Sequence, residues 1–243
     1  MITPVILTKN SEKTIKNTLN SIKSFEEIII LDTGSSDKTL QIAINFKNTK
    51  IFKSEFKGFG LLRNEAANKT KNDWILALDS DEIITENLLK ELQNIELNEN
   101  IVYSIPFFNF YNKKLIKCCG WHNKRHIRLY NKKTTKFDNS LVHEGVIYKN
   151  LQIKKLKNPI HHFPFNSISD FIKKIEKYSS LFAEENIYKK SSINKAIIHS
   201  LFSFFKSYFI KRGIFSGKEG LIISIYNSNT AFYKYLKIAE RWF

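Results

Sequence analysis

The chain has 243 residues, and its 39 Lys and Arg residues exceed its 23 Asp and Glu residues to give a formal net charge of +16. A hydrophobic content of 42% and a charged content of 26% supply a folded core, which excludes global disorder. The eight Gly and four Pro residues exclude a collagen-like chain, while the positive charge leaves nucleic acid and anionic membrane open as partners.

The first hundred residues alternate strand and helix signals. Short apolar runs predict strands at 3–8, 27–32, 50–54 and 74–78. Apolar residues at helical spacing predict helices between these runs, the last of them over 61–68. This order predicts an α/β domain with a doubly wound parallel sheet and right-handed crossovers.

Three of these predicted strands end in polar or acidic residues. Thr8 and Asn10 follow the first strand, Asp32 ends the second, and Asp79 and Asp81 follow the fourth. Such residues often only form turns, but ligands of doubly wound sheets bind beyond the carboxyl ends of the strands. Two carboxylates spaced as Asp79 and Asp81 are suited to Mg²⁺ or Mn²⁺, which can bridge nucleotide phosphates.

Other nucleotide-binding motifs are missing from the sequence. There is no Walker A loop, and the segment 58–60 (GFG) lacks the third glycine and the strand-to-helix context of a dinucleotide-binding turn. We therefore reject a Rossmann dinucleotide site. The adjacent Cys118 and Cys119 form neither a disulfide framework nor a CxxC metal motif, which favours a reducing, cytoplasmic setting. The first residues lack a basic region with a long apolar core, so we expect no secretory signal.

The pattern changes after residue 100. Strands are predicted at 103–111, 127–130 and 142–148, and the chain reads as helical from Ser167 onward. Aromatic residues alternate with Lys and Arg near residues 204–212, a composition typical of helices at a membrane interface. The alternative is an ordinary helix that packs its aromatic face on the rest of the protein.

The chain resembles the family 2 glycosyltransferases, which have a GT-A fold, in the order and spacing of four segments: VILTKNSEKTIKNTLNSI, EIIILDTGSSDKT, GFGLLRNEAA and DWILALDSDE. Later segments look like the bacterial subgroup that extends lipopolysaccharide or lipooligosaccharide core: RHIRLYN, FDNSLVHEGV, HHFPFNSISDFIKKIEKY and KSYFIKRGIFSGKEGL. The resemblance implies a Rossmann-like GT-A domain for nucleotide-diphospho-sugars over 1–165. A helical, basic and aromatic extension over 166–243 would then contact a membrane.

On this resemblance, the donor site is expected around the strand ends. Thr8, Asn10 and Asp32 would contact the uridine of a UDP-sugar. Arg63 would stand near the base or the diphosphate, unless it is an ordinary arginine on a helix surface. Asp79 would face the ribose or the metal, and Asp81 would bind Mg²⁺ or Mn²⁺ directly and so offset the charge on the departing diphosphate.

The resemblance also implies a catalytic base and contacts to the acceptor. Glu144 in the VHE segment is the candidate general base, since inverting transfer needs a carboxylate to accept the acceptor's proton; pairing with a nearby Lys is the alternative. His162 is a possible further metal ligand, with substrate contact or packing as alternatives. Five further residues are candidates on the acceptor side: Arg125, Arg128, His143, Lys174 and Tyr178. Many family members have Asn-Glu-Glu after the first strand, so Ser11 departs from the pattern and is expected to act only as a helix cap.

The function implied is transfer of a hexose, first of all glucose from UDP-glucose, onto a heptose of the inner core. The protein would be cytoplasmic and peripheral on the inner membrane, with no nucleic-acid partner. Other donors remain open, namely UDP-galactose or a UDP-N-acetylhexosamine, for another cell-surface glycan. The rival classes are a GT-A-like nucleotidyltransferase, a catalytically dead membrane-attached scaffold, and a non-catalytic basic protein that binds membrane or nucleic acid.

Overall fold

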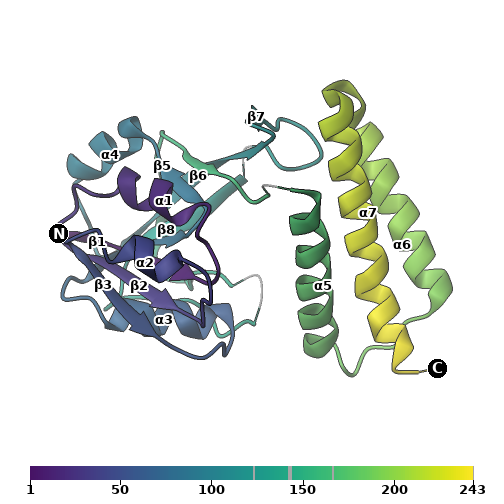
Figure 1. Cartoon of the computed structure of the whole chain (residues 1–243), viewed down its shortest axis with the longest axis horizontal. Coiled ribbons are helices and arrows are strands. Elements are labelled where there is room, and N and C mark those ends of the chain that lie inside the picture. The colour runs from purple at the N-terminus through teal and green to yellow at the C-terminus, as the bar shows by residue number, and fades with distance from the viewer. Residues whose placement is uncertain (123, 142–143, 166, 243) are drawn as a thin grey trace. The chain divides into compact units, whose positions relative to one another are not determined.

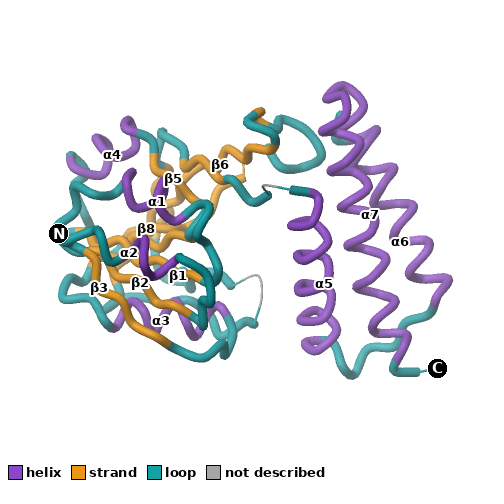
Figure 2. Tube along the Cα trace, in the orientation of Figure 1, coloured by secondary structure: helices purple, strands orange, loops and turns teal. Residues whose placement is uncertain are grey.

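The structure is a computed structural model and describes residues 1–122, 124–141, 144–165 and 167–242. It divides into two compact units, the first made of residues 1–107 and 124–163 and the second of residues 108–123 and 164–243. Strands dominate the first unit and helices the second (Figure 2). The division into 1–165 and 166–243 stays a prediction, and the grouping of 108–123 with the second unit was not among the expectations from sequence.

The first unit contains most of the strands and the four short helices of the chain (Figure 1). In chain order they are β1 (Ile2–Thr8), α1 (Ile15–Ser21), β2 (Ile28–Asp32), α2 (Thr39–Ala43), β3 (Thr49–Lys53), α3 (Phe59–Asn68), β4 (Trp74–Asp79), β5 (Glu82–Ile84), α4 (Glu86–Gln93), β6 (Ile101–Tyr111, which continues into the second unit), β8 (Lys124–Asn131), β9 (Gln152–Lys155) and β10 (Ile160–His162).

The sheet has the strand order β3-β2-β1-β4-β8-β6-β10-β5, with β9 paired to β6. β1 pairs in parallel with β2 and β4, and β2 pairs in parallel with β3. β8 is antiparallel to both β4 and β6, so the sheet is mixed beyond β4. The predicted doubly wound parallel part is thus confirmed for the first four strands of the chain.

Two apolar clusters cover the two faces of this sheet. One contains Ile15 and Leu19 of α1 together with Leu88 of α4, and the other contains Leu62 and Ala66 of α3. Every residue of β2 is buried, as its continuous apolar sequence predicts for a strand covered on both faces. This two-sided core fixes the carboxyl ends of β1, β2 and β4 at one edge.

The second unit contains β7 (Lys114–Leu115), α5 (Ile168–Glu185), α6 (Ile193–Phe205), the π-helical turn η1 (Lys206–Ile210), the 3₁₀ turn η2 (Gly213–Ser216) and α7 (Gly217–Glu240). Ser167 caps α5 in a capping box with Asp170, as its position at the start of the predicted helical region allows. Phe165 and Phe171 stack with their ring centroids 3.8 Å apart in the core of this unit. None of the described helices is long and apolar enough to cross a membrane.

The strand predicted at 142–148 is wrong for those of its residues that the structure describes. Among the described residues of 142–148, only Val146 forms a bridge, to Phe137, and no strand is present. The backbone there turns instead, because Asp138 accepts a hydrogen bond from Gly145 N and donates its own N–H to Gly145 O. The segment is therefore a closed loop, and Glu144 lies on it.

Candidate active site

The polar strand ends predicted from sequence meet at one edge of the sheet. β1 lies between β2 and β4, and the parallel register pairs Thr8 with Asp32 and Leu7 with Asp79. The strand order reverses its direction of growth at β1, which is where doubly wound sheets bind ligands. The structure thus brings Thr8, Asp32 and Asp79 together, as the alternating strands and helices suggested.

The loops after β1 and β2 are bonded to each other. Asn10 Oδ1 accepts from Ser36 N at 2.8 Å, and Asn10 N donates to Ser35 Oγ at 2.9 Å. Glu12 N donates to Asp37 Oδ2 at 3.0 Å, and Glu12 Oε2 accepts from Lys38 N at 3.2 Å. This edge is therefore fixed before any ligand arrives, which lowers the entropy that a ligand loses in ordering it.

Ser11, which departs from the family pattern, joins the loop after β1 to the turn after β4. Its Oγ lies 2.7 Å from the Oγ of Ser80, the middle residue of the Asp79-Ser80-Asp81 triplet. Thr18 of α1 adds a second bond, donating to Ser80 O at 3.0 Å. Ser11 O also accepts from Thr14 N and Ile15 N at the start of α1. The expectation that Ser11 acts only as a helix cap is therefore wrong, because the N-cap of α1 is Thr14 and the Ser11 hydroxyl bonds Ser80 instead.

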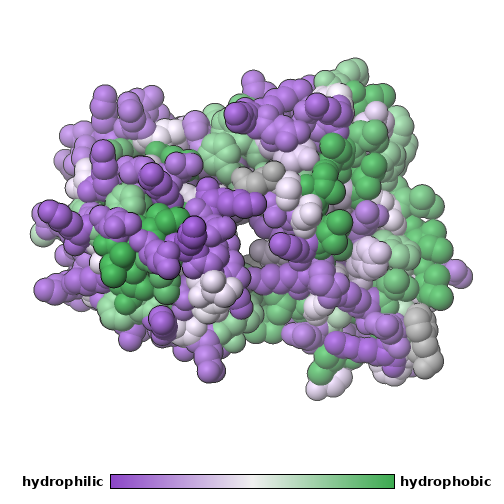
Figure 3. All heavy atoms as spheres, in the orientation of Figure 1, coloured by the Kyte–Doolittle hydropathy of each residue, from purple (hydrophilic) through white to green (hydrophobic). Residues whose placement is uncertain are grey.

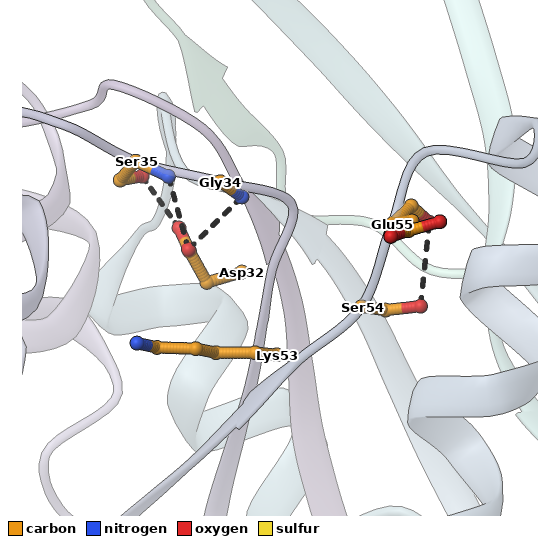
Figure 4. Close-up of a pocket in the computed structure, with 6 residues that line it drawn as sticks. All are labelled: Asp32, Gly34, Ser35, Lys53, Ser54 and Glu55. Carbon is orange, nitrogen blue, oxygen red and sulfur yellow. Dashed lines mark hydrogen bonds between the residues drawn. The ribbon is translucent and has the colours of Figure 1, made fainter.

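A pocket of about 430 Å³ opens beyond the ends of β2 and β3, within the usual size range of small-molecule sites. Its lining comes from the turn after β2 and from the end of β3 with the residues that follow it (Figure 4): Asp32, Gly34, Ser35, Lys53, Ser54 and Glu55. The lining combines two carboxylates, two hydroxyls and a lysine, which is suitable for a polar ligand.

The Asp32 carboxylate can accept a further hydrogen bond at this pocket. Its Oδ2 accepts from the backbone N–H groups of Gly34 and Ser35 at 3.1 and 3.0 Å, and its Oδ1 accepts from Ser35 Oγ at 2.5 Å. An ionised carboxylate has about four acceptor positions, so three bonds leave room for a donor such as the uracil imide N–H. Thr8 Oγ1, although buried, has no hydrogen-bond partner among the described residues. Both observations agree with the predicted uridine contacts, which stay predictions.

Arg63 of α3 connects the triplet to the candidate base. Only 2% of its side chain is exposed, so the alternative of an ordinary arginine on a helix surface is wrong. Its Nη2 donates to Asp79 Oδ1 at 2.7 Å, its Nη1 donates to Leu78 O at 2.9 Å, and its Nε donates to Glu144 Oε1 at 3.4 Å. Glu144 therefore lies at the same edge as Asp79, although 65 residues separate them in the sequence.

Arg128 of β8 holds Asp79 from the other side. Its Nη2 donates to Asp79 Oδ2 at 3.0 Å and to Glu82 Oε1 at 2.5 Å, and its guanidinium lies over the ring of Phe107. Burial works to raise the pKa of Asp79, but Arg63 and Arg128 outweigh it and hold that pKa well below the usual range. Asp79 is therefore ionised at neutral pH, with both oxygens on arginines, and its role as a metal ligand stays a prediction.

Glu82 completes this network from the short strand β5. It is almost fully buried, and its Oε2 accepts from Asp79 N at 3.0 Å. Burial raises the pKa of Glu82 to about 7, with Arg128 opposing the shift and the charge of Asp79 adding to it. Two arginines and two acids thus fix the backbone at the end of β4.

Asp81 and His162 form the part of the site that suits a cation. His162 Nε2 lies 3.6 Å from Asp81 Oδ1, and Phe163 N donates to Asp81 O at 3.0 Å. Within the described ranges, no group of three or more His, Cys, Asp or Glu is placed to hold a metal ion. Carboxylate and imidazole are ligand types that Mn²⁺ accepts, and metal binding by Asp81 and His162 stays a prediction.

The loop that carries Glu144 rests on the start of α3. Phe59 N donates to Leu141 O and Gly60 N donates to Ser140 O, each at 3.2 Å. A Cβ atom at residue 60 would lie 1.8 Å from Asp138 O, so only glycine permits this contact. The GFG segment thus supports the loop of the candidate base through backbone contacts.

The acceptor-side candidates are distributed over both units. In the first unit, Arg125 donates to Leu156 O at 2.7 and 3.0 Å, and the buried Arg128 points to Asp79 and Glu82. In the second unit, Lys174 Nζ lies 4.7 Å from the ring centroid of Phe165, and Tyr178 is on the same helix α5. His143 lies outside the described residues. Acceptor contacts by these residues stay predictions.

The sequence model for the family described as "Glycosyl transferase family 2" matches residues 3–156, which is more than half of the chain. The chain belongs to glycosyl transferase family 2. It is therefore a glycosyltransferase, and the first unit carries most of the matched segment.

Known proteins similar to this family member support the same assignment. A protein of Rickettsia bellii named an uncharacterized glycosyltransferase is 29% identical over 255 residues, covering 98% of this chain and 85% of the relative. A second one from Rickettsia typhi is 29% identical and covers 98% of this chain and 86% of the relative. The crystal structure of Staphylococcus aureus TarS 1–349 in complex with UDP-GlcNAc superposes with a TM-score of 0.51 at 14% identity, covering 99% of this chain and 91% of that chain. The predicted GT-A fold with a helical C-terminal part is confirmed.

Several residues of the site were missed by reasoning from sequence. Glu82 directly follows the triplet, but a single acidic residue in a short strand carries no signal of its own. Phe107 lies between His126, His162 and Arg128, with ring centroids 4.9 Å from His126 and 6.1 Å from His162. Its aromatic run predicted a strand but did not predict these contacts.

Replacing Gly60 by Ala should displace the loop of Glu144, because the added methyl group meets Asp138 O. A displacement of about 1 Å in catalytic geometry can cost on the order of 100-fold in rate, so we expect kcat to fall by about that factor while UDP binding persists. The measurement is steady-state glycosyl transfer together with calorimetry of UDP.

The matched control is Gly145→Ala in the same loop, where the nearest atom to a Cβ is Asp138 Oδ2 at 3.7 Å, an ordinary contact. This control should keep near-normal kcat. Equal effects of the two substitutions, with both proteins folded by circular dichroism, would contradict the role assigned to Gly60.

Proposed function

We propose that this glycosyltransferase moves a hexose, first of all glucose, from a UDP-sugar with inversion of configuration onto a heptose of lipopolysaccharide or lipooligosaccharide inner core. The observation that carries the proposal is the bridge made by Arg63, which bonds both Asp79 and Glu144. It supports one site where a candidate base faces the end of the strand that carries the Asp79-Ser80-Asp81 triplet. Family membership supports the reaction class, and the sugar and the acceptor are the proposed part.

The donor proposal is supported by the strand ends and the pocket beyond β2 and β3. Asp32 would accept from the uracil imide, and the unpartnered Thr8 hydroxyl would bond the nucleoside. Arg63 and Asp79 would lie at the ribose and diphosphate. Asp81 and His162 would hold Mn²⁺ or Mg²⁺, which when bound would offset the charge on the departing diphosphate.

The chemical step proposed for Glu144 is proton removal. The acceptor hydroxyl oxygen attacks the anomeric carbon from the side opposite the diphosphate, and its proton passes to the Glu144 carboxylate. The new C–O bond forms as the bond to the UDP oxygen breaks, so the electron pair leaves with UDP and the configuration inverts. Arg63 holds Glu144 by a 3.4 Å contact and leaves the second carboxylate oxygen for the hydroxyl.

A second donor is favoured by a specific similarity. Staphylococcus aureus TarS, a poly(ribitol-phosphate) beta-N-acetylglucosaminyltransferase, is 34% identical over 98 residues, which cover 36% of this chain and 17% of TarS. N-acetylglucosamine is therefore the alternative sugar, for another cell-surface glycan, and UDP-galactose remains a further donor. A non-catalytic basic protein for membrane or nucleic acid is disfavoured by the assembled acidic set at the strand ends.

The proposed location is peripheral, on the cytoplasmic face of the inner membrane, where a lipid-anchored acceptor would present its sugars. The net charge of +16 supports attraction to an anionic membrane surface. The proposal includes no nucleic-acid partner.

Replacing Glu144 by Gln should lower kcat by about 10²- to 10⁴-fold, because an amide cannot accept the proton. The assay measures UDP release from UDP-glucose, UDP-galactose and UDP-N-acetylglucosamine with lipooligosaccharide core as acceptor and Mn²⁺ present. UDP affinity, measured by calorimetry, should remain nearly unchanged.

The control for this substitution is Glu86→Gln, since Glu86 is exposed in the first turn of α4. It should leave kcat near the parent value. Loss of UDP binding in parallel with turnover would remove Glu144 as the base, and an absence of turnover with every donor would overturn the proposed function.

Replacing Asp81 by Ala should remove the part of UDP affinity that depends on Mn²⁺, because the variant loses a carboxylate ligand. Calorimetry of UDP with Mn²⁺ and with EDTA measures this part directly. Asp73→Ala is the control, since Asp73 precedes the start of β4 and pairs with the exposed Lys133. If the parent protein bound UDP equally well with and without metal, the metal role of Asp81 would be refuted.

A further inference from the structure

The outward side of α6 and of the two turns after it is apolar. We define the α6 face by six exposed residues, Leu201, Phe202, Phe205, Phe209, Ile210 and Phe215. Phe202 is 58% exposed, Ile210 is 61% exposed, and Phe215 is 83% exposed. Figure 3 shows apolar surface gathered over the α6 and α7 part of the molecule. Single exposed apolar residues are normal, but a contiguous set of this kind marks an interaction surface.

The inward side of the same helix is built from small and polar residues. Ser200 Oγ lies 2.9 Å from Ser228 Oγ of α7, and Ser203 Oγ donates to Asn227 O at 3.1 Å. Asn227 Nδ2 donates to Ser207 Oγ at 2.9 Å. Ser200, Ser203 and Ser207 thus form the contact between α6 and α7 while the large side chains point outward.

The distribution of apolar and polar side chains on α6 is the reverse of the one usual for a helix in water. An amphipathic helix normally turns its large apolar residues toward the protein core and its polar residues toward solvent. Small residues and hydroxyl contacts between helices are instead typical of helices surrounded by lipid, where the outside is as apolar as the inside. The α6 face therefore fits an apolar phase.

The charges around the α6 face identify which apolar phase it meets. Residues 186–218 contain seven Lys and Arg residues and no Asp or Glu. Lys206 Nζ lies 5.8 Å from the ring centroid of Phe202, so a cation stands beside the aromatic residues. A second copy of this chain would bring like charges together, whereas anionic lipid headgroups would neutralise them.

We propose that the α6 face docks in the headgroup region of an anionic bilayer, with α6 lying in the plane of the membrane. Aromatic residues with neighbouring cations are the composition of interfacial helices. The proposal deepens the proposed function by naming the surface that would meet the lipid. It rests on the proposed function in one respect, that the acceptor is anchored in the same membrane.

The test is flotation of the full chain with phosphatidylcholine vesicles and with vesicles of equal parts phosphatidylcholine and phosphatidylglycerol. The parent protein should float with the anionic vesicles. The triple variant Phe202→Ser, Phe205→Ser and Phe209→Ser should stay in the soluble fraction. Neutralisation of Lys206 and Lys218 to Gln should weaken partitioning by roughly 30-fold, since each cation contributes about a fivefold increase.

Matched controls change equivalent residues of the first unit. Ile44→Ser with Tyr148→Ser and Ile153→Ser removes exposed apolar surface, and Lys136→Gln with Lys149→Gln neutralises two exposed charges. Both controls should float like the parent. Equal flotation of the triple variant, or no flotation of the parent with anionic vesicles at low salt, would overturn the proposal.

Two further measurements separate the possible outcomes. A parent dimer that the triple variant converts to monomer, seen by sedimentation velocity, would assign the α6 face to a second copy and overturn the proposal. UDP release by the folded triple variant with a soluble core oligosaccharide should equal that of the parent. If the parent floated but transferred no sugar, the proposed function would fail while the docking surface stood.

Discussion

The ion pair between Arg63 and Asp79 is the interaction on which the site depends. Arg63 is almost completely buried, and a buried guanidinium without an acceptor is strongly destabilising. Asp79 supplies that acceptor and is itself held by Arg128 from β8, which also bonds Glu82. Helix α3, the end of β4, strands β5 and β8, and the loop of Glu144 are thereby fixed relative to one another. The placement of the candidate base beside the end of β4 follows from these few charges.

The loops around this network are ordered by bonds of their own. The loop after β1 is bonded to the loop after β2 through Asn10 and to the triplet through Ser11. The loop of Glu144 packs against α3 because residue 60 has no side chain. A site held in this way has its geometry before a ligand binds, which lowers the cost of ordering it on binding.

The parallel half of the sheet could be predicted from sequence because its strands are continuous apolar runs followed by turn residues. The strand ends Asp32 and Asp79 were predicted for the same reason, since parallel strands end at one edge. The partners of Asp79 could not be predicted, because Arg63 and Arg128 reach it across 16 and 49 residues. Periodicity carries no information about such pairings. The strand predicted at 142–148 failed for a related reason, because contacts with Asp138 close the segment into a loop.

The helical part shows a second limit of sequence patterns. Aromatic residues at helical spacing near 204–209 predicted an amphipathic helix, but the same spacing results whether its apolar side faces a core or a membrane. Only the contacts of Ser200 and Ser203 with α7 show which side is packed. Part of the excess positive charge of the chain thus lies in the second unit, next to exposed aromatic residues.

The most direct test of this account is a double-mutant cycle on the free energy of unfolding, using Arg63→Met, Asp79→Asn and the double variant. If the guanidinium and the carboxylate stabilise each other, each single replacement leaves the other group without that partner, and the second replacement then costs little. We predict that each single variant loses about 3 kcal/mol and that the double variant loses clearly less than the sum of the two losses. Chemical unfolding of the four proteins, followed by circular dichroism, measures these differences. Losses that simply add in the double variant would contradict the account.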